Sequence, residues 1–425
     1  MAMKSDFLGQ SMKFHRNRPL KASICLQKPF VAPLRRHNSE MTLKISSRAN
    51  IAPFYVMEVM RSASEKENRG ENVLHLEVGQ PSTPAPVEAR AAAVQAIEND
   101  ILGYTSALGL DSLRQGLSTL YRNNYNCEVP ASRIAVTMGA SGAFTLAFLA
   151  CFEPGDRVAV PTPGYPCYRN VLEALNIDVV EVPVGPETRY QPSPELLASV
   201  GPIDGLVVAS PSNPTGTMLS SEDLTDLIHW CQAEEVRFIS DEIYHGITYG
   251  IEASSAASLW EEVVVVNSFS KYFSMTGWRV GWLVLPPDLV SPVERLAQNA
   301  FIAATSVSQH AALGALASRA ELEENLRRYA TNREILLRGL PQAGIDNLAP
   351  ADGAFYIWAQ VDHLCDDSQE LAADWLEGLG IAVTPGIDFD PVNGHRFIRF
   401  SFAGSTAETA EAVAELSKWA EARRS

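Results

Sequence analysis

A run of four valines at residues 263–266 constrains the fold of this chain most strongly. A short stretch in which every side chain is apolar predicts a strand that is buried on both faces, as in parallel sheets covered by helices on both sides. Further strand-like runs occur at 157–160, 206–209 and 236–239, with helical patterns between them. The sequence therefore predicts an α/β fold with a largely parallel sheet.

Helical periodicity predicts three of the covering helices, at residues 86–99, 111–122 and 223–233. In the first of these, Val87, Ala91, Val94 and Ile97 share one side. A fourth helix is predicted to begin near Gly139, after the β-rich run R-I-A-V-T.

Lys271 follows the valine run in a stretch with few other charges. An ordinary lysine is solvated, but a lysine amine attacks carbonyls when burial or nearby positive charge lowers its pKa from about 10.4. Pyridoxal phosphate (PLP) uses such a lysine, and it also needs phosphate donors and a carboxylate beside its pyridine nitrogen. Arg279 offers a planar fork for a phosphate, and Ser268 and Ser270 offer hydroxyl groups. This stretch therefore predicts covalent binding of PLP.

The phosphate is predicted to lie at the helix that begins near Gly139. The free backbone N–H groups of Gly139, Ala140 and Ser141 would point at an anion there, and the helix dipole would favour the negative charge. An ordinary strand-to-helix connection would have the same local sequence.

Several motifs, in one order from about residue 45 to the C-terminus, resemble the class I and II aminotransferases of PLP enzyme fold type I. They are LEVGQP at 76–81, GYTSALGLDSLR at 103–114, RIAVTMGASGAFTLAFL at 133–149, PTPGYP at 161–166, SPSNPTG at 210–216, SDEIY at 240–244, the Lys271 stretch at 263–282 and FIRFSFA at 397–403.

The resemblance assigns further residues to the cofactor. Tyr165 would stack on the ring, and Asn213 and Tyr244 would donate to its phenolic oxygen. Asp241 would pair with the pyridine nitrogen, where a charge-assisted hydrogen bond contributes roughly 1.5–3 kcal/mol. Tyr104 would reach the phosphate of the neighbouring subunit in a homodimer.

On the substrate side, the resemblance implies that Arg399 pairs with the α-carboxylate, and that Gly79 and Asn213 lie beside it. Two features of the sequence concern the side chain of the preferred amino acid. The GASGA motif has no cation for a second carboxylate, which argues against aspartate. Phe54 and Tyr55 indicate a neutral or aromatic side chain, unless they belong to the core.

The fold implied by the resemblance has a large PLP-binding domain at 81–310, with a mostly parallel seven-stranded sheet between helices. Residues 45–80 and 311–425 would form a smaller α+β domain.

Residues 1–44 are predicted to be a disordered basic extension, because residues 1–40 hold eight Lys and Arg against two acidic residues. A transit peptide or an over-long start, with Met41 as the working initiator, would also fit this composition.

The activity implied is transamination between an L-amino acid and a 2-oxo acid, by ping-pong Schiff-base chemistry in which Lys271 moves the Cα proton. A PLP-dependent β-lyase is the alternative on the same scaffold. A PLP-sensing transcription regulator is a more remote alternative. Such a regulator would need a DNA-binding domain before the enzyme-like domain, and the first forty residues, interrupted by Pro19, Pro29 and Pro33, are too few for one.

Composition agrees with a metabolic enzyme. The net charge of −16 argues against nucleic acid as a partner, and no apolar run is long enough to span a membrane. The six cysteines contain no C-x-x-C, and the histidines have no metal-ligand spacing, so no metal is expected. Reduced cysteines indicate a cytoplasmic location.

Overall fold

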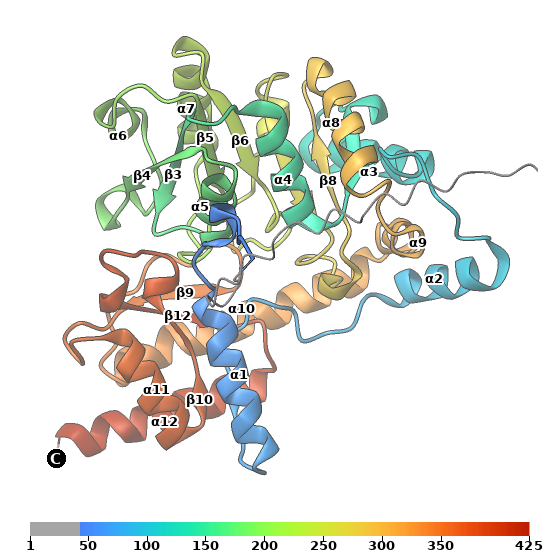
Figure 1. Cartoon of the computed structure of the whole chain (residues 1–425). Helices are drawn as coiled ribbons and strands as arrows, with labels where there is room; N and C mark the ends of the chain where they lie inside the picture. Colours follow the sequence, from blue (N-terminus) through green and yellow to red (C-terminus); the bar gives the residue numbers. More distant parts are fainter. Residues whose placement is uncertain (1–42, 425) are drawn as a thin grey trace, which may run out of the picture. The chain divides into compact units, whose positions relative to one another are not determined.

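The structure, a computed structural model, describes residues 43–424 (Figure 1). The basic segment 1–42, including the predicted start at Met41, lies outside the described residues. Residues 46 onward form one compact unit. Its division into a large domain at 81–310 and a small domain from 45–80 and 311–425 stays a prediction.

A seven-stranded sheet lies at the centre of this unit, in the order β2-β8-β7-β6-β5-β3-β4. All strands run parallel except β8, which is antiparallel to both its neighbours. This confirms the predicted sheet. The strands are β2 (Ile134–Thr137), β3 (Arg157–Thr162), β4 (Asp178–Pro183), β5 (Gly205–Ala209), β6 (Arg237–Asp241), β7 (Val264–Ser268) and β8 (Gly281–Val284).

Helices cover both faces of this sheet, as the valine run predicts. Val263 and Val265 pack into the core under α2, α3, α7 and α9, whereas Val264 and Val266 pack into the core under α4, α5 and α8. These helices are α2 (Val87–Asn99), α3 (Asp111–Tyr125), α4 (Gly139–Cys151), α5 (Pro166–Ala174), α7 (Ser221–Ala233), α8 (Pro287–Ala300) and α9 (Ser306–Ala315), with the short α6 (Pro194–Ser199) between β4 and β5.

A second, antiparallel sheet has the order β11-β12-β9. Its strands are β9 (Tyr356–Gln360), β11 (Thr384–Pro385) and β12 (Phe397–Ser401), and a separate parallel pair joins β1 (Leu74–His75) to β10 (Ile381–Ala382). The helices α10 (Arg319–Gln342), α11 (Ser368–Leu379) and α12 (Thr406–Arg424) pack around a core of their own with these strands. Helix α1 (Tyr55–Asn68) precedes β1 in the sequence.

The helices at 86–99, 111–122 and 223–233 are confirmed within a few residues, but the first one buries an unexpected face. In α2, Val87, Val94 and Ile97 are 54%, 54% and 61% exposed, and Ala91 is exposed as well. The buried residues of this helix are Ala89, Ala93 and Ala96. The reason is the close approach of α9, because a Cβ on Gly314 would lie 2.5 Å from the carbonyl oxygen of Glu88. Only small side chains fit between two helices at this distance, so the larger ones point outward.

None of the described helices is both long and apolar enough to cross a lipid bilayer.

Candidate active site

A cavity of about 280 Å³ lies where β5, β6 and β7 end. This is the edge at which open α/β sheets bind ligands. The cavity brings together eleven of the fourteen site residues predicted from the sequence. They are Gly79, Ala140, Ser141, Tyr165, Asn213, Asp241, Tyr244, Ser270, Lys271, Arg279 and Arg399.

Lys271 enters the cavity three residues after β7 ends. Its Nζ donates a hydrogen bond to the carbonyl oxygen of Gly79, at 2.6 Å. Burial lowers the pKa of Lys271 to about 8, and the positive charges of Arg399 and Arg279 act in the same direction, against the smaller opposing effect of Asp241. The amine therefore has a larger neutral, nucleophilic fraction near neutral pH than an ordinary lysine.

Asp241 is the last residue of β6 and is only 3% exposed. Its carboxylate accepts hydrogen bonds from the Tyr168 hydroxyl and from the backbone N–H of Ile243, the latter at 3.0 Å. Burial raises the pKa of Asp241 to about 6, although both hydrogen bonds and Lys271 oppose this. A carboxylate held here in a dry site is suited to pair with a cationic ring nitrogen.

The N-terminus of α4 offers free donors to an anion. In the described part of the chain, no side chain caps this helix, so the backbone N–H groups of its first turn have no side-chain acceptor there. Arg279 lies against the same turn, because a Cβ on Gly139 would come within 2.7 Å of the Arg279 Nη2. Among residues 43–424, no carboxylate forms an ion pair with Arg279, whose guanidinium donates only to the backbone oxygen of Thr276, at 3.1 Å. These groups could hold a phosphate.

Three tyrosines surround the middle of the cavity. Tyr165 lies in the loop before α5, and the Tyr244 hydroxyl is 2.7 Å from that of Tyr356. Tyr356 also explains the glycine at position 79, because a Cβ there would lie 1.9 Å from the Tyr356 hydroxyl oxygen. Any larger residue at position 79 would displace this ring.

Arg399 is a buried cation with an incomplete set of partners. It is 3% exposed and lies between the rings of Tyr356 and Phe389, at 4.4 and 4.6 Å from their centroids. One Nη donates to Asn213 Oδ1 at 2.9 Å, and the other donates to the backbone oxygen of Glu77 and, at 3.2 Å, to the Thr384 hydroxyl.

The Nε of Arg399 is buried without a hydrogen-bond partner, and no carboxylate pairs with its guanidinium within the described part of the chain. An unpaired buried cation is costly, unless a ligand supplies the missing anion. The position of Arg399 at the cavity is therefore suited to a substrate carboxylate.

Three predicted residues do not line the cavity. Gly139 lies behind it, next to Arg279. Ser268 is buried, and its hydroxyl is within hydrogen-bonding distance of the Ser270 Oγ, at 2.8 Å, and the Val280 carbonyl oxygen. Tyr104 is 85% exposed.

The cavity also contains residues that sequence reasoning did not identify. Val56, Met57 and Met60 of α1 form an apolar wall, and Tyr168 and Tyr356 supply the hydroxyl groups beside Asp241 and Tyr244. Phe54 and Tyr55, from which the sequence indicated a neutral or aromatic substrate side chain, directly precede this wall and do not line the cavity. Phe54 itself stacks on Tyr165, with 6.1 Å between ring centroids.

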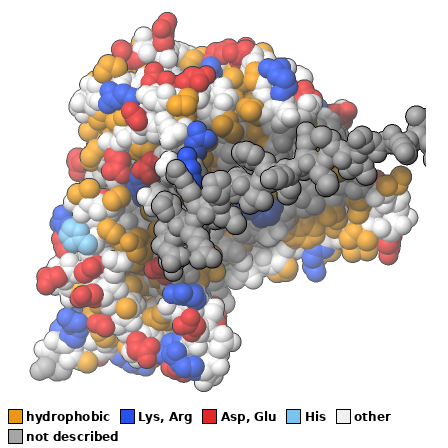
Figure 2. All heavy atoms as spheres, viewed as in Figure 1, with side chains coloured by type: hydrophobic (Ala, Val, Ile, Leu, Met, Phe, Trp, Pro, Cys, Tyr) orange, Lys and Arg blue, Asp and Glu red, His pale blue; other side chains and the backbone are white. Residues whose placement is uncertain are grey.

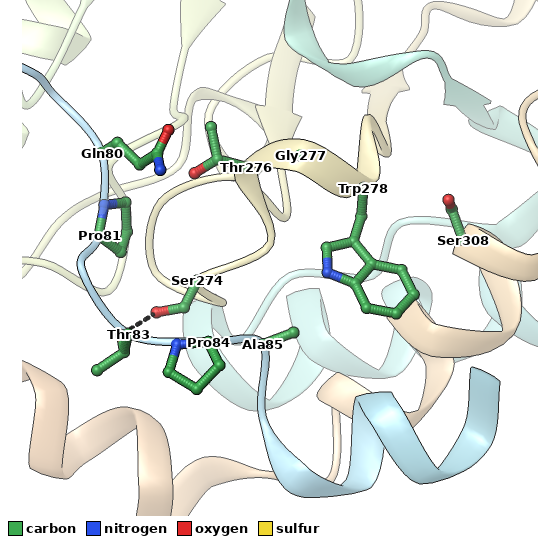
Figure 3. Close-up of a pocket in the computed structure, with 10 residues that line it drawn as sticks. All are labelled: Gln80, Pro81, Thr83, Pro84, Ala85, Ser274, Thr276, Gly277, Trp278 and Ser308. Atoms are coloured by element: carbon green, nitrogen blue, oxygen red, sulfur yellow. Dashed lines mark hydrogen bonds between the residues drawn. The ribbon is translucent and has the colours of Figure 1, made fainter. Parts of the chain in front are cut away.

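A second cavity, of about 390 Å³, adjoins the first and shares Gln80 and Thr276 with it (Figure 3). The segment before α2 lines one side and the loop after Lys271 lines the other. A hydrogen bond of 3.0 Å between the Thr83 and Ser274 hydroxyl groups joins the two sides. Residues of the Lys271 loop thus line both cavities.

Comparison with known proteins agrees with this geometry. The family described as aminotransferase class I and II matches residues 71–416. The chain is 46% identical to a valine–pyruvate aminotransferase of Mycobacterium tuberculosis, over 89% of this chain and 99% of the relative.

Solved structures give the same result. A crystal structure of an aminotransferase from Mycobacterium tuberculosis has a TM-score of 0.88 and 46% identity, covering 90% of this chain and all of the other. The aspartate aminotransferase of Thermus thermophilus with maleate has a TM-score of 0.84 and 29% identity, covering 89% and 100%. Members of this family generally depend on PLP. The chain belongs to the class I and II aminotransferases, and its activity is transamination.

Proposed function

We propose that this enzyme binds PLP through Lys271 and transfers an amino group between a small neutral L-amino acid and a 2-oxo acid. One observation carries the proposal: the buried guanidinium of Arg399, which has no ion-pair partner among residues 43–424, lines the same cavity as the low-pKa amine of Lys271. The first group fits the carboxylate shared by amino and oxo acids, and the second fits a carbonyl.

The other residues fit the cofactor group by group. The uncapped N-terminus of α4 at Gly139, Ala140 and Ser141, together with Arg279, would hold the phosphate. Ser270 would add a hydroxyl group, with Ser268 behind it. Asp241 would pair with the ring nitrogen, Tyr165 would stack on the ring, and Asn213 and Tyr244 would donate to the phenolic oxygen.

The chain's own groups would then divide the reaction between them. Arg399, held by Asn213 and the Glu77 carbonyl, would orient the substrate carboxylate, beside the backbone of Gly79. The Lys271 Nζ would accept the Cα proton and return it later. The bound cofactor would supply an electron-withdrawing ring that stabilises the negative charge left at Cα. Two substrates that use one site in turn give ping-pong kinetics.

The substrate side chain would face α1. Val56, Met57 and Met60 offer apolar surface and no cation, which favours an aliphatic side chain over a second carboxylate. The Mycobacterium tuberculosis relative is named for valine and pyruvate. We therefore propose valine as an amino donor and pyruvate as an acceptor.

A half-reaction experiment tests this function. Purified protein loaded with PLP is mixed with single amino acids, and the visible absorbance of the bound cofactor is followed. Valine should change the spectrum and release its 2-oxo acid. Lys271→Ala should lose the covalently bound cofactor and reduce transamination by more than about 10³-fold, whereas Lys418→Ala, an exposed lysine on α12, should behave like the wild type. A normal rate in Lys271→Ala would refute the proposal.

We also propose a homodimer. Larger apolar side chains of α2 and the following loop remain exposed, namely Val87, Val94, Ile97, Ile101 and Tyr104. Figure 2 shows hydrophobic side chains gathered in the region of α2 and α9. A second copy would cover this surface, and its Tyr104 would reach the phosphate of the neighbouring site. Sedimentation that gives the mass of one chain would refute this.

A cytoplasmic location also stays a proposal. The five cysteines within the described residues are all unpaired, which is usual in a reducing compartment.

A further inference from the structure

Helix α1 does not cap its own N-terminus. Its N-cap residue, Phe54, provides no side-chain acceptor for the free N–H groups of the first turn. Asp388 supplies the acceptor from a loop more than 330 residues further along the chain. Its Oδ1 accepts the Tyr55 N–H at 3.1 Å, and its Oδ2 accepts the Val56 N–H at 3.3 Å.

The Asp388 carboxylate is well placed to hold this helix. It is 3% exposed, and it lies where the positive end of the helix dipole favours an anion. Burial raises the pKa of Asp388, while the two N–H groups and the charges of Arg399 and Arg169 counteract that rise. A carboxylate that accepts two backbone N–H bonds fixes both the position and the direction of a helix.

The loop that carries Asp388 is itself fixed to the active site. Phe389, the next residue, lies on the guanidinium of Arg399, and its carbonyl oxygen accepts the Gly164 N–H at 3.1 Å, next to Tyr165. A Cβ on Gly386 would lie 2.4 Å from the Gly394 carbonyl oxygen, so the loop is closely packed. Asp388 thus joins α1 to a rigid support that also positions the carboxylate-binding arginine.

The helix fixed in this way forms one wall of the cavity. Val56, whose N–H is bound by Asp388, lines the cavity together with Met57 and Met60. All three lie in the first two turns of α1, close to the attachment. Loss of the attachment would let this apolar wall move away from the substrate side chain while Lys271 and Asp241 stay in place on the large sheet.

We propose that Asp388 is a positioning residue for substrate specificity: by fixing the first turn of α1, it holds the apolar wall against the donor's side chain. This inference rests on the proposed transamination. It predicts that Asp388 matters more for valine, whose branched side chain reaches the wall, than for alanine, whose methyl group is short. Loss of Asp388 should change kcat/KM for valine relative to alanine, whereas a general loss of stability would lower kcat/KM equally for both donors.

The experiment compares kcat/KM for valine and for alanine in holoenzyme variants. In Asp388→Ala, the valine-to-alanine ratio of kcat/KM should fall about tenfold, mainly through a higher KM for valine. Asp388→Asn keeps the size of the side chain and one acceptor, so it should give a smaller fall and guards against misfolding of the alanine variant.

Asp390 provides a matched control on the same loop. It is 5% exposed, and its Oδ1 accepts two backbone N–H groups, from Val392 and Asn393, each at 2.9 Å, without a bond to α1. Asp390→Ala should reduce stability but leave the ratio of the two donors unchanged. An equal fall for both donors in Asp388→Ala, or the same change of ratio in Asp390→Ala, would overturn the proposal.

Two further measurements test the mechanism itself. Amide hydrogen exchange at Tyr55 and Val56 should speed up in Asp388→Ala and not in Asp390→Ala. This readout needs no turnover, so it tests the attachment even if the proposed activity fails for every donor. In a Met60→Ala background, the wall is already reduced, so adding Asp388→Ala should change the donor ratio by less than about threefold. Unchanged exchange, or fully additive effects, would overturn the proposal.

Discussion

Two sides of one cavity are built in different ways. On the side of the large sheet, Asn213, Asp241 and Lys271 each lie within four residues of the end of a parallel strand. On the side of α1, the wall at 56–60 is fixed by Asp388, far away in the sequence. The first side carries the charged and polar groups that we propose to bind PLP, and the second is mainly apolar. If both proposals hold, the groups that react lie on the sheet, whereas the choice of substrate depends on a long-range attachment.

Of the three substitutions considered next, Arg399→Lys should have the largest effect. Arg399, on β12, is the residue proposed to bind the substrate carboxylate. A lysine cannot form the planar bidentate contact with a carboxylate, so kcat/KM should fall about 10²-fold for both amino and oxo acids, mainly through KM. Arg396→Lys is the control, because that arginine pairs with Asp362 at the surface. Its kinetics should stay within about twofold of the wild type. Equal losses in steady-state kinetics of the two variants would show that Arg399 does not bind the carboxylate.

Tyr168→Phe tests the sheet side with a smaller expected effect. The Tyr168 hydroxyl donates to Asp241 and lowers the pKa of that carboxyl. Without this donor, the pKa of Asp241 should rise above about 6, so the acidic limb of the pH–rate profile should move to higher pH, and kcat should fall about fivefold.

Tyr121→Phe is the control for this change, since its hydroxyl accepts from the Trp282 indole, away from the cavity. The valine-to-alanine ratio should stay the same in Tyr168→Phe. If that ratio changed, the division of roles between the two sides would be wrong.

His75 gives the smallest expected effect, at the other end of α1. Its ring nitrogens lie 2.9 Å from Glu77 and 3.2 Å from Glu67, in the last turn of that helix. The hydrogen bond with Glu77, opposed by burial and aided by Glu67, raises the pKa of His75 to about 9. A raised pKa means that the charged histidine stabilises the fold fully below about pH 6.5, and that this contribution disappears as the pH rises through 9.

The melting temperature of His75→Gln should therefore lie about 2 °C below that of the wild type at pH 6 and match it at pH 10. The effect is small because the side chain is partly exposed and the charges are screened. A difference that grew with pH would contradict the assigned sign.

The sequence predicted the large sheet and most residues at its edge, because each local pattern there reports one strand and the residues that follow it. The stretch after its strand singled out Lys271, whereas Asp241 and Asn213 were assigned through the resemblance to the aminotransferase motifs. The sequence did not identify Tyr168 or Tyr356, since a tyrosine in a helix or strand has no local signal of what its hydroxyl group meets. The buried side of α2 was also unexpected, because the closeness of α9 cannot be read from the periodicity of one helix.

Hydrophobic periodicity and short motifs are local properties, so the amino-acid sequence was enough to predict that strands alternate with helices and which chemical groups follow several of the strands. The folded chain was needed to show which groups share a cavity with Arg399, and that Asp388 caps a helix near the other end of the chain. The physical reason is that hydrogen bonds and packing depend on distance in space, and the chain must fold before residues 55 and 388 become neighbours.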